Sequence, residues 1–75
     1  MERYKDLTGM SGVLRFEEGT DYLIVEFVGR ERYLYDAHKP GAHALTEMKR
    51  LARQGKGLAT YISQKVRLNY AKKLS

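Results

Sequence analysis

The chain has 75 residues, of which 43% are hydrophobic and 31% charged, and it contains no cysteine. This length is expected to form one domain, near the lower limit at which a single apolar core stabilises a fold without cross-links. The lack of cysteine excludes disulfides and thiolate metal sites and favours the cytoplasm. The apolar runs are far shorter than the roughly 20 residues that span a bilayer, and no signal-peptide pattern is present, so no membrane association is expected.

The net charge of +5 is unevenly distributed along the chain. Residues 1–36 contain five basic and eight acidic side chains, whereas residues 37–75 contain nine basic side chains and a single acidic one, Glu47. The two halves therefore carry −3 and +8. A strongly basic half favours a polyanionic partner such as RNA, although basic residues also gather at helix C-termini and on solvated helix faces.

Residues 1–10 are expected to form a polar tail or a short lead into the first strand, and residues 11–75 a single domain. Segments rich in β-branched and aromatic residues, separated by turn residues, predict an antiparallel meander. The three predicted strands are residues 13–17, 22–28 and 32–35. Alternation with a period of two places one set of apolar side chains on the core face. That set consists of Leu14, Phe16, Leu23, Val25 and Phe27.

Two registers of the second hairpin place Tyr33 and Tyr35 differently. A two-residue loop pairs Val25 with Leu34 and turns both tyrosines to the open face of the sheet. A three-residue loop, residues 29–31, pairs Phe27 with Tyr33 and turns both rings into the core. We favour the second register because the first leaves two aromatic rings on the open face. Burial of both rings predicts that replacing either one with alanine costs about 3–5 kcal/mol.

After residue 36 the hydrophobic period changes to that of a helix. Pro40 suits the first turn of a helix that ends near Gln54, before Gly55. A second helix is predicted to begin after Gly57 and to run to about residue 70. The sequence thus predicts an α+β fold, a three-stranded antiparallel meander followed by two α-helices packed on one face (βββαα). The apolar stripes of the helices consist of Ala42, Ala44, Leu45, Met48, Leu51, Ala52, Leu58, Ala59, Ile62, Val66 and Tyr70.

No combination of residues predicts catalysis, a metal site or a cofactor. His38 and His43 have no cysteine or regularly spaced carboxylate beside them, so they do not match metal-ligand patterns. No serine or threonine has a convincing general base with an orienting partner. The segment Gly55-Lys56-Gly57 precedes a helix N-terminus, where backbone amides favour anions. It lacks the rest of any nucleotide-binding motif, and a helix cap followed by a turn explains it better.

The residues expected to bind nucleic acid are the cations of the two helices and the C-terminal tail. Like-charged neighbours on the first helix repel each other, and counterion release on binding phosphates would offset that repulsion. A tyrosine among such charges can stack on an unpaired base, although each tyrosine is more typical of a core or rim position. The predicted contact residues are Lys49, Arg50, Arg53, Lys56, Lys65, Arg67, Lys72, Lys73 and Tyr61.

A series of motifs extends over residues 11–70, and it consists of Leu23 to Phe27, Gly29, Tyr33-Leu34-Tyr35, Pro40, Leu51-Ala52, Gly57 and Tyr61-Ile62. Their order and spacing resemble the KTSC domain family, a small domain that also occurs at the C-terminus of some lysyl-tRNA synthetases. The central Tyr-x-Tyr motif of that family matches Tyr33 and Tyr35. The segment between Tyr35 and Gly57 is a few residues longer here, so the resemblance does not determine the loop into the first helix. The attachment to a tRNA-handling enzyme implies RNA binding.

Charge and resemblance together predict a non-catalytic accessory domain that binds nucleic acid, RNA before DNA. The alternative is a protein-interaction module, of phage or mobile-element origin, whose basic helices meet an acidic partner. A contiguous exposed apolar patch would favour that alternative, whereas basic residues gathered on one face favour RNA. The apolar residues left outside the predicted core stripes are Tyr22, Ile24, Tyr61 and Leu68.

Overall fold

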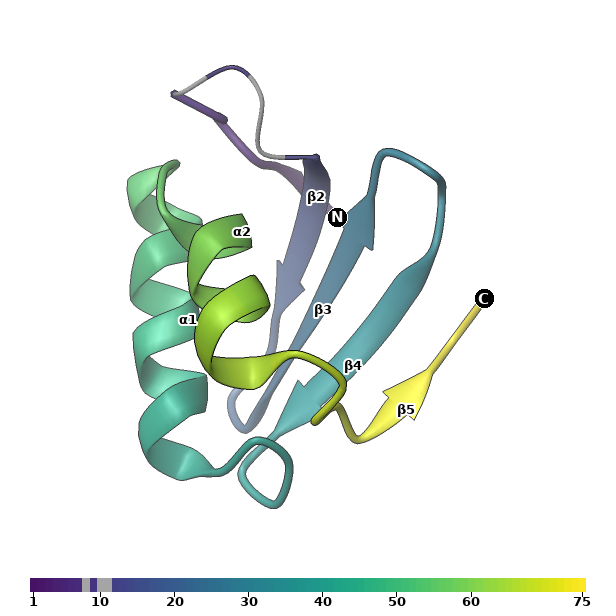
Figure 1. The fold of residues 1–75 in the computed structure, drawn as a ribbon, viewed down its shortest axis with the longest axis vertical. Coiled ribbons are helices and arrows are strands. Elements are labelled where there is room, and N and C mark those ends of the chain that lie inside the picture. The colour runs from purple at the N-terminus through teal and green to yellow at the C-terminus, as the bar shows by residue number, and fades with distance from the viewer. Residues whose placement is uncertain (8, 10–11) are drawn as a thin grey trace.

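A computed structural model of the chain describes residues 1–7, 9 and 12–75. The predicted boundary between residues 10 and 11 lies outside the described residues. Five antiparallel strands follow one another in sequence order across one sheet, and the helices cover one of its faces (Figure 1). The strands are β1 (Glu2–Arg3), β2 (Val13–Glu18), β3 (Tyr22–Phe27), β4 (Arg32–Asp36) and β5 (Lys72–Lys73). The helices are α1 (Ala42–Gln54) and α2 (Leu58–Tyr61), which continues as the π-helical turn η1 (Ile62–Val66).

The predicted α+β class, with an antiparallel sheet and two helices, is confirmed. The predicted number of strands is wrong, because β1 and β5 extend the meander at its two edges. Each of these strands has two residues, all exposed and charged. Charged pairs of this kind carry no β-strand signal. Their pairing comes from the open edges of β2 and β4, which supply the backbone hydrogen-bonding partners.

A β-bulge in β2 changes which residues face the core. Val13 pairs with Phe27 and Arg15 pairs with Glu26, so β2 has one more residue than β3 over this stretch. The extra residue reverses the alternation on one side of the bulge. As a result Val13 is buried, and Leu14, which was predicted to face the core, is only partly buried.

The loop between β3 and β4 has three residues, as predicted, but it begins one residue earlier. The Phe27 N–H donates to the Glu31 carbonyl at 2.9 Å, so the loop consists of residues 28–30 rather than 29–31. The Arg30 N–H donates back to the Phe27 carbonyl at 2.8 Å. Arg30 adopts the left-handed conformation, with φ of 70°, and this conformation closes the turn.

This loop shifts the strand register by two residues relative to the prediction. Tyr33 pairs with Val25, and Tyr35 pairs with Leu23, so the predicted partners Phe27 and Val25 are wrong. Because side chains alternate with a period of two, a shift of two residues leaves both tyrosines on the core face. Tyr35 is fully buried, with 1% of its surface exposed, as predicted. Tyr33 lies at the rim of the core and is half-buried.

The first helix has the predicted end and the predicted buried side. Gly55 ends α1 in the left-handed conformation, with φ of 86°, and its N–H donates to the Leu51 carbonyl at 3.0 Å. Pro40 lies just before the helix, and Ala42 at its start is exposed. The buried residues of α1 are Leu45, Met48, Leu51 and Ala52.

The second helix is shorter than predicted, since it ends at Val66 rather than near residue 70. Arg67 leaves the helix with φ of 54°, and its N–H donates to the Ile62 carbonyl at 2.5 Å. The chain then pairs with β4, where the Ala71 N–H donates to the Leu34 carbonyl at 2.7 Å. Pairing at the edge of the sheet therefore replaces the last predicted turns of helix.

The N-terminal segment is part of the packed structure. Tyr4, just after β1, has only 2% of its surface exposed and belongs to the core cluster. Its hydroxyl accepts a hydrogen bond from the Leu58 N–H at 3.3 Å. The Leu7 N–H donates to the Gly55 carbonyl at 2.7 Å. These contacts join the start of the chain to the turn between the two helices.

Candidate nucleic-acid interface

The cations of α1 are largely engaged with partners in the same chain. The Lys49 ammonium donates to the carbonyl oxygens of Gly19 and Thr20, at 2.7 and 2.9 Å. These carbonyls lie in the turn between β2 and β3, so Lys49 fixes α1 to that turn. A lysine with two short internal hydrogen bonds is a poor partner for a phosphate.

Arg50 is bound along its own helix. Its Nε donates to Glu47 at 3.0 Å, its Nη2 forms a salt bridge with the same carboxylate at 2.5 Å, and its Nη1 donates to Gln54 at 3.1 Å. The hydrogen bonds from the Arg50 guanidinium lower the pKa of Glu47. Both side chains are exposed enough for solvent to weaken the pair. The charge of Arg50 is nevertheless compensated locally.

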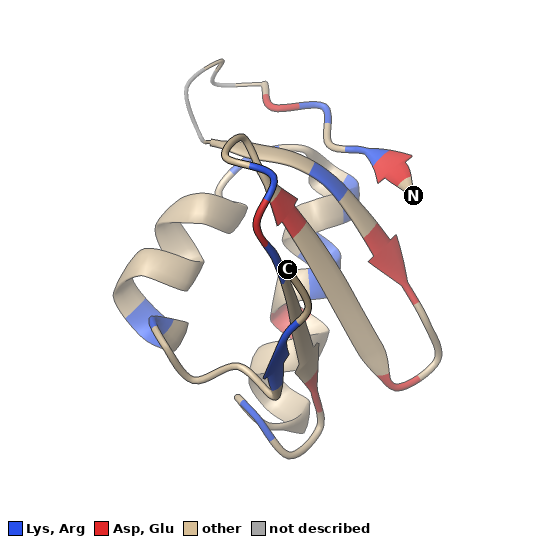
Figure 2. Cartoon of the chain, turned by 90° about the vertical axis from the view of Figure 1, so that its right-hand side faces the viewer, with Lys and Arg blue, Asp and Glu red and all other residues tan. Residues whose placement is uncertain are grey.

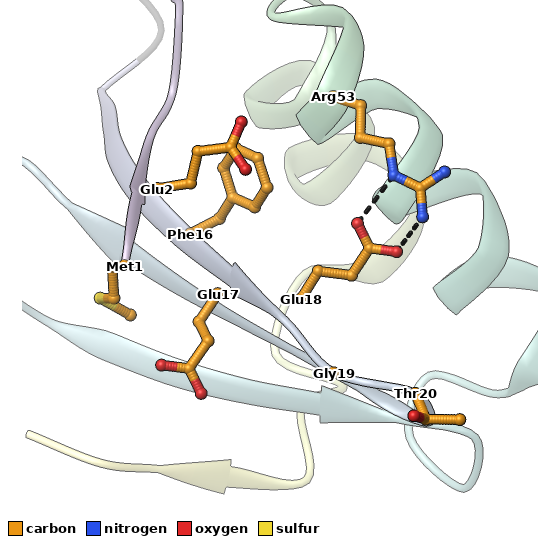
Figure 3. A pocket seen from close by; sticks show the side chains of 8 residues that line it. All are labelled: Met1, Glu2, Phe16, Glu17, Glu18, Gly19, Thr20 and Arg53. Carbon is orange, nitrogen blue, oxygen red and sulfur yellow. Dashed lines mark hydrogen bonds and ion pairs between the residues drawn. The ribbon is translucent and has the colours of Figure 1, made fainter.

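Arg53 is bound across the fold to β2. Its Nε donates to Glu18 at 2.8 Å, and its Nη2 bonds the second oxygen of the same carboxylate (Figure 3). The pair lines a hollow of about 590 Å³ that also contains Glu2 and Glu17. Three carboxylates and one guanidinium surround this hollow, so it disfavours a phosphate. Arg53 thus holds α1 against the sheet.

The Arg53–Glu18 pair predicts a pH dependence of stability. The guanidinium lowers the pKa of Glu18 below its usual 4.5, first through the hydrogen bond and then through its charge. A lowered carboxyl pKa contributes stability above pH 4.5, and this contribution is lost as the pH falls through the folded-state pKa. We expect Glu18→Gln to lower the melting temperature at pH 7, with the difference from the parent shrinking below pH 4.5. A difference that stays constant between pH 7 and pH 3 would contradict this role.

The other predicted cations lie in the turn between the helices, at the end of η1 and on β5. Lys56 is exposed in the turn between the helices, and Lys65 and Arg67 are exposed at the end of η1. Figure 1 shows α1 and β5 on opposite sides of the molecule, and in Figure 2 the lysines and arginines are spread over several elements. The structure therefore does not bring all of the predicted contact residues onto one surface.

One aromatic cluster does join predicted residues with cations. The ring of Tyr33 meets Phe27 edge-on, with centroids 5.7 Å apart, and lies 4.6 Å from the ring of Tyr70. The Lys73 ammonium stands over the Tyr33 ring, 5.8 Å from its centroid. All three rings are only partly buried. The cluster lies at the rim of the core, between β4, β5 and the segment that follows η1.

Sequence reasoning placed only part of this cluster correctly. The sequence predicts functional or motif roles for Tyr33 and Lys73, whereas it predicts Tyr70 in a helical stripe and Phe27 in the core. The early end of the second helix brings Tyr70 to Tyr33, and no pattern in the sequence indicates that end. Tyr61, predicted to stack on bases, is partly buried and packs against the core.

The four apolar residues outside the predicted core stripes do not form one patch. Tyr22 and Ile24 line a groove of about 340 Å³ with Leu34 and Leu74, on the face of the sheet opposite the helices. Tyr61 packs on the helical side of the sheet. Leu68 has 83% of its surface exposed in the segment after η1.

Among the described residues, no helix has the length and apolarity needed to cross a membrane. Within the same residues, histidines and carboxylates do not gather in groups of three or more that could hold a metal ion. The resemblance to the KTSC domain stays a prediction from the sequence motifs. No protein-family model, no protein of characterised function and no solved structure gives a significant match to this chain.

Proposed function

We propose that the protein is a non-catalytic accessory domain that binds single-stranded nucleic acid, RNA in preference to DNA, in the cytoplasm. The observation that carries this proposal is the partly exposed Tyr33 ring, which lies against Tyr70 with the Lys73 ammonium above it. Stackable rings beside cations are the combination that single-stranded nucleic acids require. We define the C-terminal basic surface as this cluster together with the exposed cations that precede Tyr70 in the chain, so it consists of Tyr33, Lys65, Arg67, Tyr70 and Lys73.

Most charges in this part of the chain favour a phosphate backbone, although the Tyr33 hydroxyl donates a hydrogen bond to the Glu31 carboxylate at 3.5 Å. Residues 48–75 contain eight basic side chains and no acidic one. In the described part of the chain, neither Lys65 nor Arg67 forms a salt bridge, in contrast to Arg50 and Arg53. Stacking of a base on an aromatic side chain contributes about 1–3 kcal/mol. Cations that contact phosphates add an electrostatic contribution that falls as salt rises. The preference for RNA rests on the resemblance to the KTSC domain.

The proposal is tested by the salt dependence of RNA binding. Fluorescence anisotropy of a labelled single-stranded RNA of about 12 nucleotides gives the dissociation constant at several salt concentrations. Each neutralised phosphate contributes about −0.7 to the slope of log affinity against log salt. We expect the double variant Arg67→Gln, Lys73→Gln to bind more weakly, with a slope shallower by about 1.4.

A charge-matched control is the double variant Arg50→Gln, Lys56→Gln, which removes the same charge on the side of α1. It is expected to bind RNA with the affinity and slope of the parent. An affinity of the parent that does not change with salt, or equal losses in both double variants, would overturn the proposed surface.

An acidic protein partner is the alternative, since it would contact the same cations. Such a partner does not need an aromatic face, whereas a stacked base does. The variant Tyr70→Leu keeps an apolar side chain at this position and removes the ring. Loss of RNA binding in Tyr70→Leu supports nucleic acid. Unchanged binding of an acidic peptide by the parent and by Tyr70→Leu, without RNA binding by either, supports the protein partner.

A further inference from the structure

Three arginines and one glutamate form a row across the open face of the sheet. Arg3 pairs with Arg15 and Arg15 with Glu26, and Glu26 pairs in turn with Arg32. Directly paired residues of neighbouring strands lie on the same face of a sheet. This is the face opposite the helices, because Val25, next to Glu26, is buried in the core. At about 4.8 Å per strand, this arginine row spans about 14 Å.

A surface hollow confirms that two of these arginines lie together. Arg3 and Arg15 line a hollow of about 310 Å³, and the other residues lining it are Met1 and Leu14. Leu14 reaches this surface because the bulge in β2 removes it from the core. The hollow therefore combines two exposed guanidinium groups with two apolar side chains.

At the other end of the row, Glu26 forms an ion pair with Arg32. Its side chain is buried, with 4% of the residue's surface exposed, although the face around it is open. Its Oε1 lies 3.4 Å from the Arg32 Nε, in an ion pair without hydrogen-bond geometry. A buried carboxylate is costly unless cations accompany it. Glu26 thus compensates Arg32, while neither Arg3 nor Arg15 forms a salt bridge within the described residues.

The C-terminal strand connects the row with the C-terminal basic surface. Lys73 pairs with Tyr33 and stands over its ring, on the helical side of the sheet. Lys72 pairs with Leu34, so it lies on the open face. Figure 2 looks onto the edge of the sheet that β5 forms, and β5 runs lengthwise along it. Consecutive lysines therefore place positive charge on both sides of one edge.

We propose that a nucleic-acid strand bound at the C-terminal basic surface continues around β5 onto the open face, where Arg3 and Arg15 hold one of its phosphates in the hollow. This inference rests on the proposed function and adds a second contact region to it. The guanidinium fork matches the oxygens of a phosphate, and it forms stronger hydrogen bonds than a neutral donor. Met1 and Leu14 supply an apolar surface for the adjoining base or ribose.

The test is the double variant Arg3→Gln, Arg15→Gln, with single-stranded RNAs of about 4 and about 12 nucleotides. The longer RNA is expected to bind on the order of tenfold more weakly at 0.1 M salt, with a slope shallower by about 0.7, because one phosphate contact is lost. The shorter RNA occupies the C-terminal basic surface alone, so its affinity is expected to stay unchanged. Parent-like binding of the longer RNA by this variant would overturn the inference.

The charge-matched control is again Arg50→Gln, Lys56→Gln. An equal loss in this control would also overturn the inference, because the effect would then come from net charge and not from the hollow. A melting temperature close to that of the parent is the criterion that each variant keeps its fold. If Arg67→Gln, Lys73→Gln weakens binding and Arg3→Gln, Arg15→Gln does not, only the second contact region fails. If the parent protein binds neither RNA, both the proposed function and the second contact region fail.

Discussion

Replacing Tyr35 with alanine is expected to destabilise the domain by about 3–5 kcal/mol, which removes most of the stability of so small a fold. Tyr35 has 1% of its surface exposed and lies opposite Leu23 in the centre of the core. Tyr33→Ala is expected to cost less, about 1–3 kcal/mol, because the ring is half-buried and loses mainly its contacts with Phe27 and Tyr70. Urea denaturation followed by circular dichroism measures both free energies of unfolding.

Tyr35→Phe is the matched control, since it keeps the ring and removes the hydroxyl. Burial, followed by the nearby tyrosines, raises the pKa of Tyr35 above its usual value of 10.0. A raised pKa contributes stability that is complete below pH 10 and is lost as the pH rises toward the folded-state value. Above pH 10 the parent is therefore expected to lose stability faster than Tyr35→Phe.

The two tyrosine variants also separate a structural role from a binding role. We expect Tyr35→Ala to lose its fold, and Tyr33→Ala to keep enough stability for its RNA affinity to be measured. If Tyr35→Ala melted like the parent and lost only RNA binding, the ring would be an exposed stacking surface. The strand register described here would then be wrong by one residue.

The central elements were predictable because their signals are strong and local. Alternating β-branched and aromatic residues define β3, and Gly55 sets the end of α1. The face of the sheet on which Tyr35 lies was predictable, although the residue that pairs with it on β3 was not. A two-residue change of register moves a side chain along the strand without turning it over.

The errors lie where tertiary contacts decide the local structure. A bulge in β2 cannot be read from the apolar alternation that it interrupts, so Leu14 was placed in the core. The residues of β1 and β5 have low strand propensity and become strands by pairing with existing edges. Residues 67–70 continue a helical pattern in sequence, and pairing with β4 draws the chain away from the helix.

The candidate interface was harder to predict than the fold. The sequence gives the number of charged side chains but not the groups that each of them contacts in the fold. The Arg50–Glu47 contact is local and could have been inferred from its spacing. Lys49 and Arg53, in contrast, are bound by groups that lie 30 and 35 residues away in the chain. The arginine row was overlooked because residues 1–36 are acidic on balance. The alignment of Arg3 with Arg15 follows only from the strand register.

The N-terminal segment provides the second large expected effect, since Tyr4→Ala should destabilise the domain by about 3–5 kcal/mol. The ring fills the core, with 2% of its surface exposed, and the hydroxyl accepts the Leu58 N–H at the start of α2. Tyr4→Phe keeps the packing and loses only this hydrogen bond, for which a cost of about 1 kcal/mol is expected. The free energies of unfolding come from urea denaturation.

Leu7→Ala is the matched control within the same segment. The Leu7 side chain has 63% of its surface exposed, whereas its backbone N–H makes the contact with Gly55. The substitution keeps that contact, so a change of less than about 0.5 kcal/mol is expected. A loss of unfolding free energy that decreases in the order Tyr4→Ala, Tyr4→Phe, Leu7→Ala would show that the N-terminal segment completes the core. Equal midpoints for Tyr4→Ala and Leu7→Ala would instead show that residues 1–7 are a tail, and the hollow between Arg3 and Arg15 would lose its structural basis.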